Sequence, residues 1–359
     1  MRRRQKNKRQ VRVIVGISIC LLLIMTVGYA AFSTNLTLTA KGNIHNLVTS
    51  EKLKNKAVTS GDGLYIDAYE ENRYIFKGSN PDNHIKFNNQ DFRIVAIEND
   101  NTLKIVKEEG VGISFDAGYD LAYNNGEFSS PANSVQNTRY TTDSADYCYH
   151  ATETAYVGCG IWAGKDSLYS KDGAKLLQIP KKGAGKYNLP SSDAYINAYL
   201  NATQYVGKNL SNTYYGTIGD DKVYIQEHWF NVGSVNKVDI NVSEIIENEK
   251  EYKWKGNIGL LNISDYLKAH SMDNCDVLTS TASEDCKNSN YLYKSSLYFW
   301  LISSCGGPNG SWLVNPNGGF NCWSSRDGYK ILPVIYLKAD VKLLGSGTSS
   351  DPYTIKWDT

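Results

Sequence analysis

The chain has 359 residues, of which 41% are hydrophobic and 12% aromatic, and this composition excludes an intrinsically disordered protein. Because residues 1–12 hold seven of the 38 basic groups and none of the 37 acidic ones, the remaining 347 residues carry a net charge of −6. An acidic body of this kind argues against binding to nucleic acid.

The N-terminal region predicts export. Residues 13–32 (VIVGISICLLLIMTVGYAAF) form an uncharged stretch of 20 residues, long enough as a helix to span the hydrocarbon core of a bilayer. The basic residues 1–12 before it are expected to stay in the cytoplasm. Two interpretations remain open. One is a single-pass membrane anchor, and the other is a signal peptide cleaved near Ala30, where small residues occupy the required positions. The body is therefore predicted to lie outside the membrane, either anchored through residues 13–32 or secreted.

The end of this segment, GYAAFST over residues 28–34, resembles the signal region of the camelysin and biofilm-fibre proteins of Gram-positive bacteria. The resemblance is confined to the signal region, and nothing downstream repeats the pattern of that family. It therefore implies a route of export, and it keeps open a structural role in an extracellular matrix or fibre.

Six of the seven cysteines lie in the predicted exported body, where disulfide bonds form. Six cysteines allow 15 pairings, and their spacing favours pairs of sequence neighbours. The predicted bonds are Cys148–Cys159, Cys275–Cys286 and Cys305–Cys322. The spacing is too wide for the close pairs of a zinc site, whereas free structural thiols remain an alternative.

Residues 33–60 are predicted to form a stalk with one short strand and one short helix. NLTLTA over residues 35–40 alternates between apolar and polar side chains, and SEKLKNKAV over residues 50–58 has a helical composition behind a capping serine. No linker divides the chain after residue 60, so a single extracytoplasmic domain is predicted over residues 61–359.

The first half of this domain is predicted to contain strands and long loops. Apolar runs at residues 73–77, 92–97 and 103–106 indicate strands, and the last two are expected to pair across a loop of turn-forming residues. Residues 110–190 are rich in Gly, Ser, Asn, Asp and Tyr with weak periodicity, which predicts long surface loops.

The second half is predicted to be mainly strands with two helices. One helix follows residues 190–193, because Ile196, Tyr199 and Leu200 fall on one face, and a brief one over residues 265–270 is capped by Ser264. The predicted strands lie at residues 223–225, 257–261, 298–303, 311–314, 320–324 and 331–338. The expected fold class is α+β and predominantly β.

Five pieces of the domain, in their order, resemble bacterial surface domains with a C-type-lectin-like or formylglycine-generating-enzyme-like fold. They are Phe92–Val95 (FRIV), Ala198–Asn201 (AYLN), Ile258–Ser264 (IGLLNIS), Phe299–Ser304 (FWLISS) and Lys330–Leu337 (KILPVIYL). The resemblance spans residues 73–340 and implies a lectin-like domain at the cell surface. The chain departs from the family pattern at Ile302 and Leu332, where the family has arginine, and at Ser304, where it has proline.

No catalytic motif stands out in the sequence. The five histidines form no HExxH pair, and the chain has no GxSxG element, phosphate-binding loop or EF-hand. No catalytic residue, cofactor or metal ligand is therefore predicted. An extracytoplasmic peptidase or oxidase is kept only as a second alternative.

The predicted ligand face lies between residues 306 and 323, where Gly/Asn/Pro-rich turns meet aromatic residues. Its candidate binding residues are Trp312, Asn315, Asn317, Asn321 and Trp323. Indole rings and side-chain amides of this kind suit a sugar, provided that the rings point outward. The function predicted is a non-enzymatic surface or secreted binding or adhesion protein, with a glycan, a cell-wall polymer or another protein as its ligand. A matrix or fibre protein is the first alternative.

Overall fold

The computed structural model describes residues 47–116, 139, 141–151, 158–181, 184–201, 224–307 and 310–356. The predicted membrane or signal segment and the strand over residues 35–40 lie outside this part of the chain. Among the described residues, no helix has the length and apolar character needed to cross a membrane.

The largest sheet has nine strands and is built mostly from the two ends of the described chain. Its strands are β1 (Gly63–Ile66), β2 (Tyr74–Lys77), β3 (His84–Phe87), β4 (Gln90–Ile97), β5 (Leu103–Lys107), β12 (Ile258–Gly259), β17 (Val334–Leu337), β18 (Leu343–Leu344) and β19 (Tyr353–Ile355). They run in the order β12-β17-β5-β4-β3-β19-β18, with β2 joining β4 and β1. The predicted β4–β5 hairpin is confirmed, and six consecutive buried residues in β4 make it a central strand.

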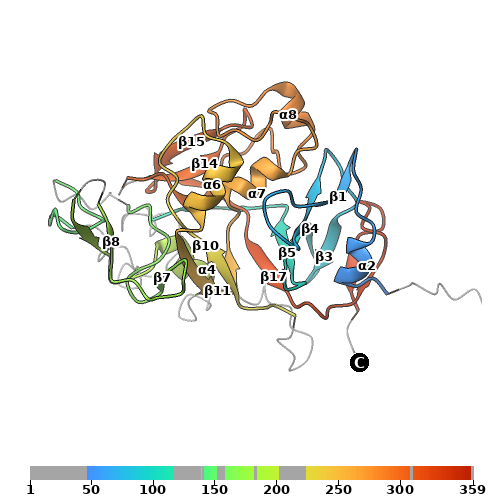
Figure 1. Ribbon diagram of the computed structural model, residues 1–359, viewed down its shortest axis with the longest axis horizontal. Helices are drawn as coiled ribbons and strands as arrows, with labels where there is room; N and C mark the ends of the chain where they lie inside the picture. Colours follow the sequence, from blue (N-terminus) through green and yellow to red (C-terminus); the bar gives the residue numbers. More distant parts are fainter. Residues whose placement is uncertain are drawn as a thin grey trace, which may run out of the picture. The chain divides into compact units, whose positions relative to one another are not determined.

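A second sheet of five strands lies above the first in Figure 1. Its order is β15 (Phe320–Ser324), β14 (Gly310–Val314), β13 (Phe299–Ser304), β16 (Gly328–Ile331) and β6 (Val111–Ser114). The single strand predicted over residues 331–338 is wrong, because the chain leaves this sheet after Ile331 and enters the nine-stranded sheet at Val334. Pro333 lies between them, and its missing N–H breaks the run of backbone hydrogen bonds.

Two smaller sheets lie at the lower left of Figure 1. One has the order β10 (His228–Asn231), β11 (Tyr252–Gly256) and β7 (Leu168–Ser170), and the other pairs β8 (Gln178–Pro180) with β9 (Lys186–Asn188). The prediction of surface loops throughout residues 110–190 is therefore wrong in part. Strands of three residues are too short to show a period in the sequence, and Trp162 from this region is fully buried.

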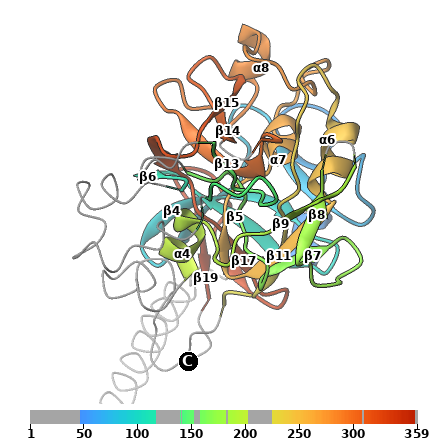
Figure 2. The same cartoon turned by 90° about the vertical axis from the view of Figure 1, so that its left-hand side faces the viewer.

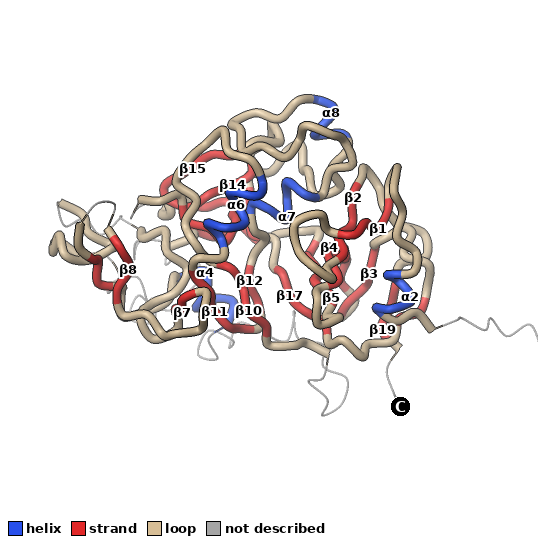
Figure 3. The backbone as a smooth tube through the Cα atoms, viewed as in Figure 1, coloured by secondary structure: helices blue, strands red, loops and turns tan. Residues whose placement is uncertain are grey.

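Five short helices complete the described chain, and strands and loops make up most of it (Figure 3). They are α2 (Ser50–Lys54), α4 (Tyr195–Asn201), α6 (Val242–Glu249), α7 (Ile263–Lys268) and α8 (Glu284–Asn288). Burial of Ile196, Tyr199 and Leu200 confirms the predicted apolar face of α4. The predicted cap of α7 is wrong. Asn262 occupies the N-cap position, and its backbone N–H donates to the carboxylate of Asp265 at 3.0 Å.

The cores of the sheets form one continuous apolar cluster. Helix α7 packs against α6 and β13, and Figure 2 shows α6 and α7 beside the sheets in a view turned by 90°. Helix α2, which the sequence placed in the stalk, packs on the same core through Leu53, and Ser50 donates a hydrogen bond to the carbonyl of Asn101. In this arrangement, one cleft is lined by residues from β5, β10, β11, β17, α6 and α7.

Candidate ligand-binding cleft

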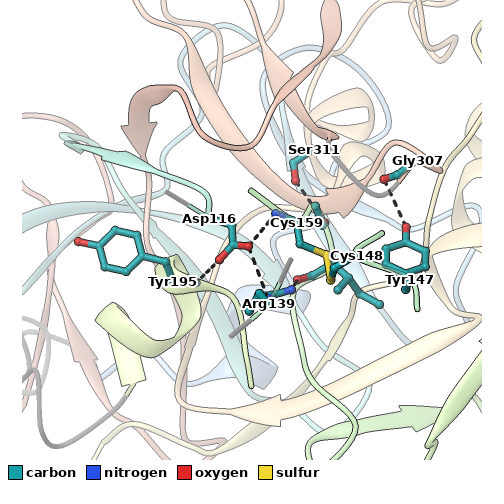
Figure 4. The surroundings of a disulfide bond; sticks show 10 residues. Asp116, Arg139, Tyr147, Cys148, Cys159, Tyr195, Gly307 and Ser311 are labelled. Atoms are coloured by element: carbon teal, nitrogen blue, oxygen red, sulfur yellow. Dashed lines mark hydrogen bonds and ion pairs between the residues drawn. A yellow bond between two sulfur atoms is a disulfide. The ribbon is translucent and has the colours of Figure 1, made fainter. Parts of the chain in front are cut away.

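The three predicted disulfides are present with the predicted pairing of neighbours: Cys148–Cys159, Cys275–Cys286 and Cys305–Cys322. They fit an extracellular protein. Beside the first bond, the carboxylate of Asp116 accepts hydrogen bonds from the backbone N–H groups of Cys159 and Tyr195, at 2.7 and 3.0 Å (Figure 4).

Among the described residues, no group of three or more His, Cys, Asp or Glu side chains is placed to hold a metal ion.

The structure divides the ligand face predicted from the sequence, and two of its candidate residues are buried. Trp312 on β14 is 3% exposed, and its indole N–H donates to the carbonyl of Val235 at 2.7 Å. The buried Asn315 donates to the carbonyl of Ser280 and accepts from the backbone N–H of Asn317. Trp312 is thus a packing residue, because β14 lies inside the sheet between β13 and β15. Asn315 follows β14 and forms the turn through its hydrogen bonds.

The other three candidates are accessible. Trp323 lies on the edge strand β15, is 43% exposed and donates its indole N–H to the carboxylate of Asp327. Asn317 is exposed, and Asn321 is half-buried beside the amide of Asn315. Trp323 is therefore the one tryptophan of the predicted ligand face that a ligand can reach.

A cleft of about 410 Å³ that the sequence analysis missed lies between the nine-stranded and the three-stranded sheets. Its walls come from segments far apart in the chain. The cleft is lined by Glu70, Arg73, Glu98, Asn99, Lys104, Lys171, His228, Trp229, Asn231, Glu247, Lys250, Lys253, Asn262, Ser264, Asp265 and Tyr336. The charged network around Arg73 forms the floor of the cleft, and its members are Asp67, Glu70, Arg73, Glu98, Lys104, Lys250, Asp265 and Lys268. The aromatic and amide side chains around Trp229 form the rim.

Arg73 is the centre of the floor. Its buried guanidinium donates to Asp67 at 2.7 Å, to both carboxylate oxygens of Glu98 at 2.8 and 3.1 Å, and to Asp265 at 3.2 Å. The two bonds to Glu98 fix the plane of the guanidinium, the bond to Asp67 lies within the β1–β2 loop, and the bond to Asp265 ties this loop to α7. One side chain therefore joins three segments that are distant in sequence.

Three lysines also pair with the carboxylates of the floor. Lys104 donates to Asp265 at 2.6 Å, Lys268 donates to Asp67 at 2.7 Å and Glu70 at 3.0 Å, and Lys250 lies 3.1 Å from Glu70. Burial opposes ionisation of Asp265, but Lys104 and Arg73 outweigh it and hold the pKa of Asp265 below its usual range. The floor is thus a paired and rigid network.

Glu249, at the end of α6, is a buried acid of a different kind. It is 1% exposed, and it accepts hydrogen bonds from the hydroxyl and backbone N–H of Ser264 and from the hydroxyl of Ser303. Within the described residues it forms no ion pair. Burial raises the pKa of Glu249, the hydrogen bonds from Ser264 oppose this effect, and the nearby charge of Asp265 adds to it, so that the pKa is about 7.

Glu249 should make folding stability fall as pH rises through the range below 7. The ordinary glutamate pKa is 4.5, so between that value and about 7 the folded protein holds a proton that the unfolded chain releases. We expect Glu249→Gln to remove this loss, which amounts to about 3 kcal/mol across the range. Urea unfolding from pH 5 to 8 measures it, with Glu247→Gln on the exposed side of α6 as the matched control. Identical pH profiles for Glu249→Gln and the unmodified protein would contradict the assignment.

The rim of the cleft carries exposed aromatic surface. Trp229 on β10 is 39% exposed, and Lys253 and Lys255 of β11 lie over its ring at 5.7 and 5.9 Å from the centroid. The ring of Tyr169 meets it edge to face at 5.2 Å. These contacts hold the indole in place while one part of it remains open.

Polar groups surround this aromatic surface. His228 stacks on Tyr336 with the ring centroids 3.9 Å apart. The side chains of Asn99, Asn231 and Asn262 line the same cleft, and the amide of Asn262 donates to the backbone carbonyl of Asn231 at 2.8 Å. An exposed indole beside amides and charged groups suits a polar ligand that also presents an apolar face.

Sequence reasoning could have found one part of this site. HWFN over residues 228–231 alternates in burial, with Phe230 inward and Trp229 outward, but its strand was not predicted. The charged floor offered no local signal, because its members lie between residues 67 and 268. Comparison of the chain with protein-family models, with curated proteins and with solved structures found no match.

Proposed function

We propose that this protein is a non-enzymatic binding protein of the cell exterior, and that its cleft holds a segment of a glycan or cell-wall polymer. In this proposal residues 13–32 anchor the protein in the membrane, or cleavage near Ala30 releases it. The exported domain then presents the cleft to its ligand.

The exposed ring of Trp229 inside a polar cleft carries the proposal. Trp229 is 39% exposed and so keeps apolar surface in water, and a sugar ring can cover that surface with its C–H groups. The amides of Asn99 and Asn231 lie within the same cleft and can exchange hydrogen bonds with hydroxyl groups. Each element of sugar recognition is thus available in one place.

Rigidity of the floor supports the same function. Arg73, Lys104 and Asp265 are held by several charge-assisted hydrogen bonds, so the base of the cleft loses little freedom when a ligand enters. The resemblance of the sequence to lectin-like surface domains also favours a binding function. A fibre protein would instead assemble as its concentration rises, and an enzyme would turn over its ligand.

Binding of the full-length protein to a glycan array and to isolated cell-wall polymers tests the proposal. Trp229→Ala is expected to weaken binding roughly tenfold or more, because it removes a central aromatic contact. Trp323→Ala is the matched control, since its ring is equally exposed but lies on β15, away from the residues of the cleft. Loss of binding in Trp323→Ala alone would place the site on β15 and contradict the cleft. Concentration-dependent assembly without glycan binding would favour a fibre protein.

A further inference from the structure

We propose that the ligand of the cleft is an anionic polysaccharide, and that Lys171 and Lys253 bind its carboxylate or phosphate groups. This inference rests on the proposed glycan-binding function and adds the charge of the ligand. The pairing of the charges in the cleft and the position of Lys253 beside Trp229 support it.

Most cations of the cleft are already compensated. Arg73 pairs with Glu98, Lys104 with Asp265, and Lys250 with Glu70. Within the described residues, Lys171 and Lys253 form no ion pair, although both line the cleft. Lys253 is half-buried, so its ammonium group gains from an anionic partner, and a ligand can supply one.

The carboxylates of the cleft do not neutralise the positive charge of these two lysines. Glu70, Glu98 and Asp265 are paired within the floor. Glu247 on α6 is exposed, and it is the remaining carboxylate among the described lining residues. The unpaired groups of the cleft are therefore two lysines and one glutamate, and the balance favours an anion.

Lys253 lies where an acidic substituent of a stacked sugar would reach it. On β11 it is paired in register with Asn231 of β10 and with Tyr169 of β7, and it is half-buried. Its ammonium group is 5.7 Å from the centre of the Trp229 ring. Lys171 follows β7 directly, and its backbone N–H donates to the carbonyl of Glu251 at 3.1 Å, which places it beside the same strand. A sugar ring on Trp229 would thus lie next to an uncompensated cation.

Binding of the full-length protein to three soluble polymers tests this inference. Polygalacturonate supplies carboxylates on sugar rings, phosphorylated dextran supplies phosphates on sugar rings, and dextran is neutral. We expect at least one anionic polymer to bind about tenfold more tightly than dextran, with an affinity that falls as salt rises. Lys253→Met should weaken anionic binding about tenfold, and the exposed Lys171→Met about threefold.

Lys255→Met is the matched control. Lys255 lies on the same strand and also over Trp229, but it pairs with Glu227 at 3.1 Å and does not line the cleft. Because Lys255 also helps to hold the indole, any loss of affinity in Lys255→Met should be the same for dextran and for the anionic polymers. A selective loss of anionic binding as large as that in Lys253→Met would overturn a specific role for Lys253. Equal binding of dextran and the anionic polymers, lost in Trp229→Ala but not in Lys253→Met, would overturn the inference and leave the glycan-binding function standing. If Trp229→Ala leaves the binding of every polymer unchanged, the proposed function itself fails.

Discussion

Replacing Arg73 with methionine is expected to lower the free energy of unfolding by about 3–5 kcal/mol. The side chain is buried and donates to Asp67, Glu98 and Asp265. Methionine fills a similar volume but leaves these carboxylates without their shared cation, and unpaired charge in a buried site is costly. Urea unfolding of the oxidised full-length protein at pH 7 measures the change.

A surface ion pair provides the comparison for Arg73. Lys86 lies 3.2 Å from Asp91, but both side chains are at least half exposed, so Lys86→Met should cost less than about 1 kcal/mol. If Arg73→Met costs no more than this control, the floor of the cleft is not the cooperative network that its hydrogen bonds indicate. The same variant is also expected to weaken ligand binding, because Arg73 links the β1–β2 loop to α7 beneath the cleft.

Trp312→Ala is expected to cost about 3–5 kcal/mol, because it removes a large side chain from the interior of the five-stranded sheet. It also leaves the carbonyl of Val235 without the hydrogen bond from the indole. Thermal or urea unfolding should therefore report a large loss of stability, and any loss of binding should follow from that instability.

Trp323→Ala is the counterpart on the exposed edge strand and should change stability by less than about 1 kcal/mol. Its indole donates to Asp327 at the surface, where water can replace the lost bond. A similar loss of stability in the two variants would contradict the difference in burial between β14 and β15. These two tryptophans lie only eleven positions apart in the strands of one hairpin, yet they have different roles.

The sequence by itself determined those features of this protein that depend on near neighbours. The disulfides join cysteines 11, 11 and 17 positions apart, where a short loop keeps the two thiols close. The β4–β5 hairpin and the apolar face of α4 were likewise predicted, because a turn or a helical period lies within one short window. The export of the body rests on residues 1–32 and stays a prediction.

Only the tertiary structure decided which strand lies beside which, and that choice set the burial of individual side chains. Trp312 is buried and Trp323 exposed because β14 is an inner strand and β15 an edge strand, and strand order is not encoded in a local pattern. Likewise, the local pattern does not show that the strands on either side of Pro333, β16 and β17, belong to different sheets. The cleft joins Glu70 to Tyr336, and its charged floor forms only when folding brings distant groups out of water together, since isolated charges would not remain buried.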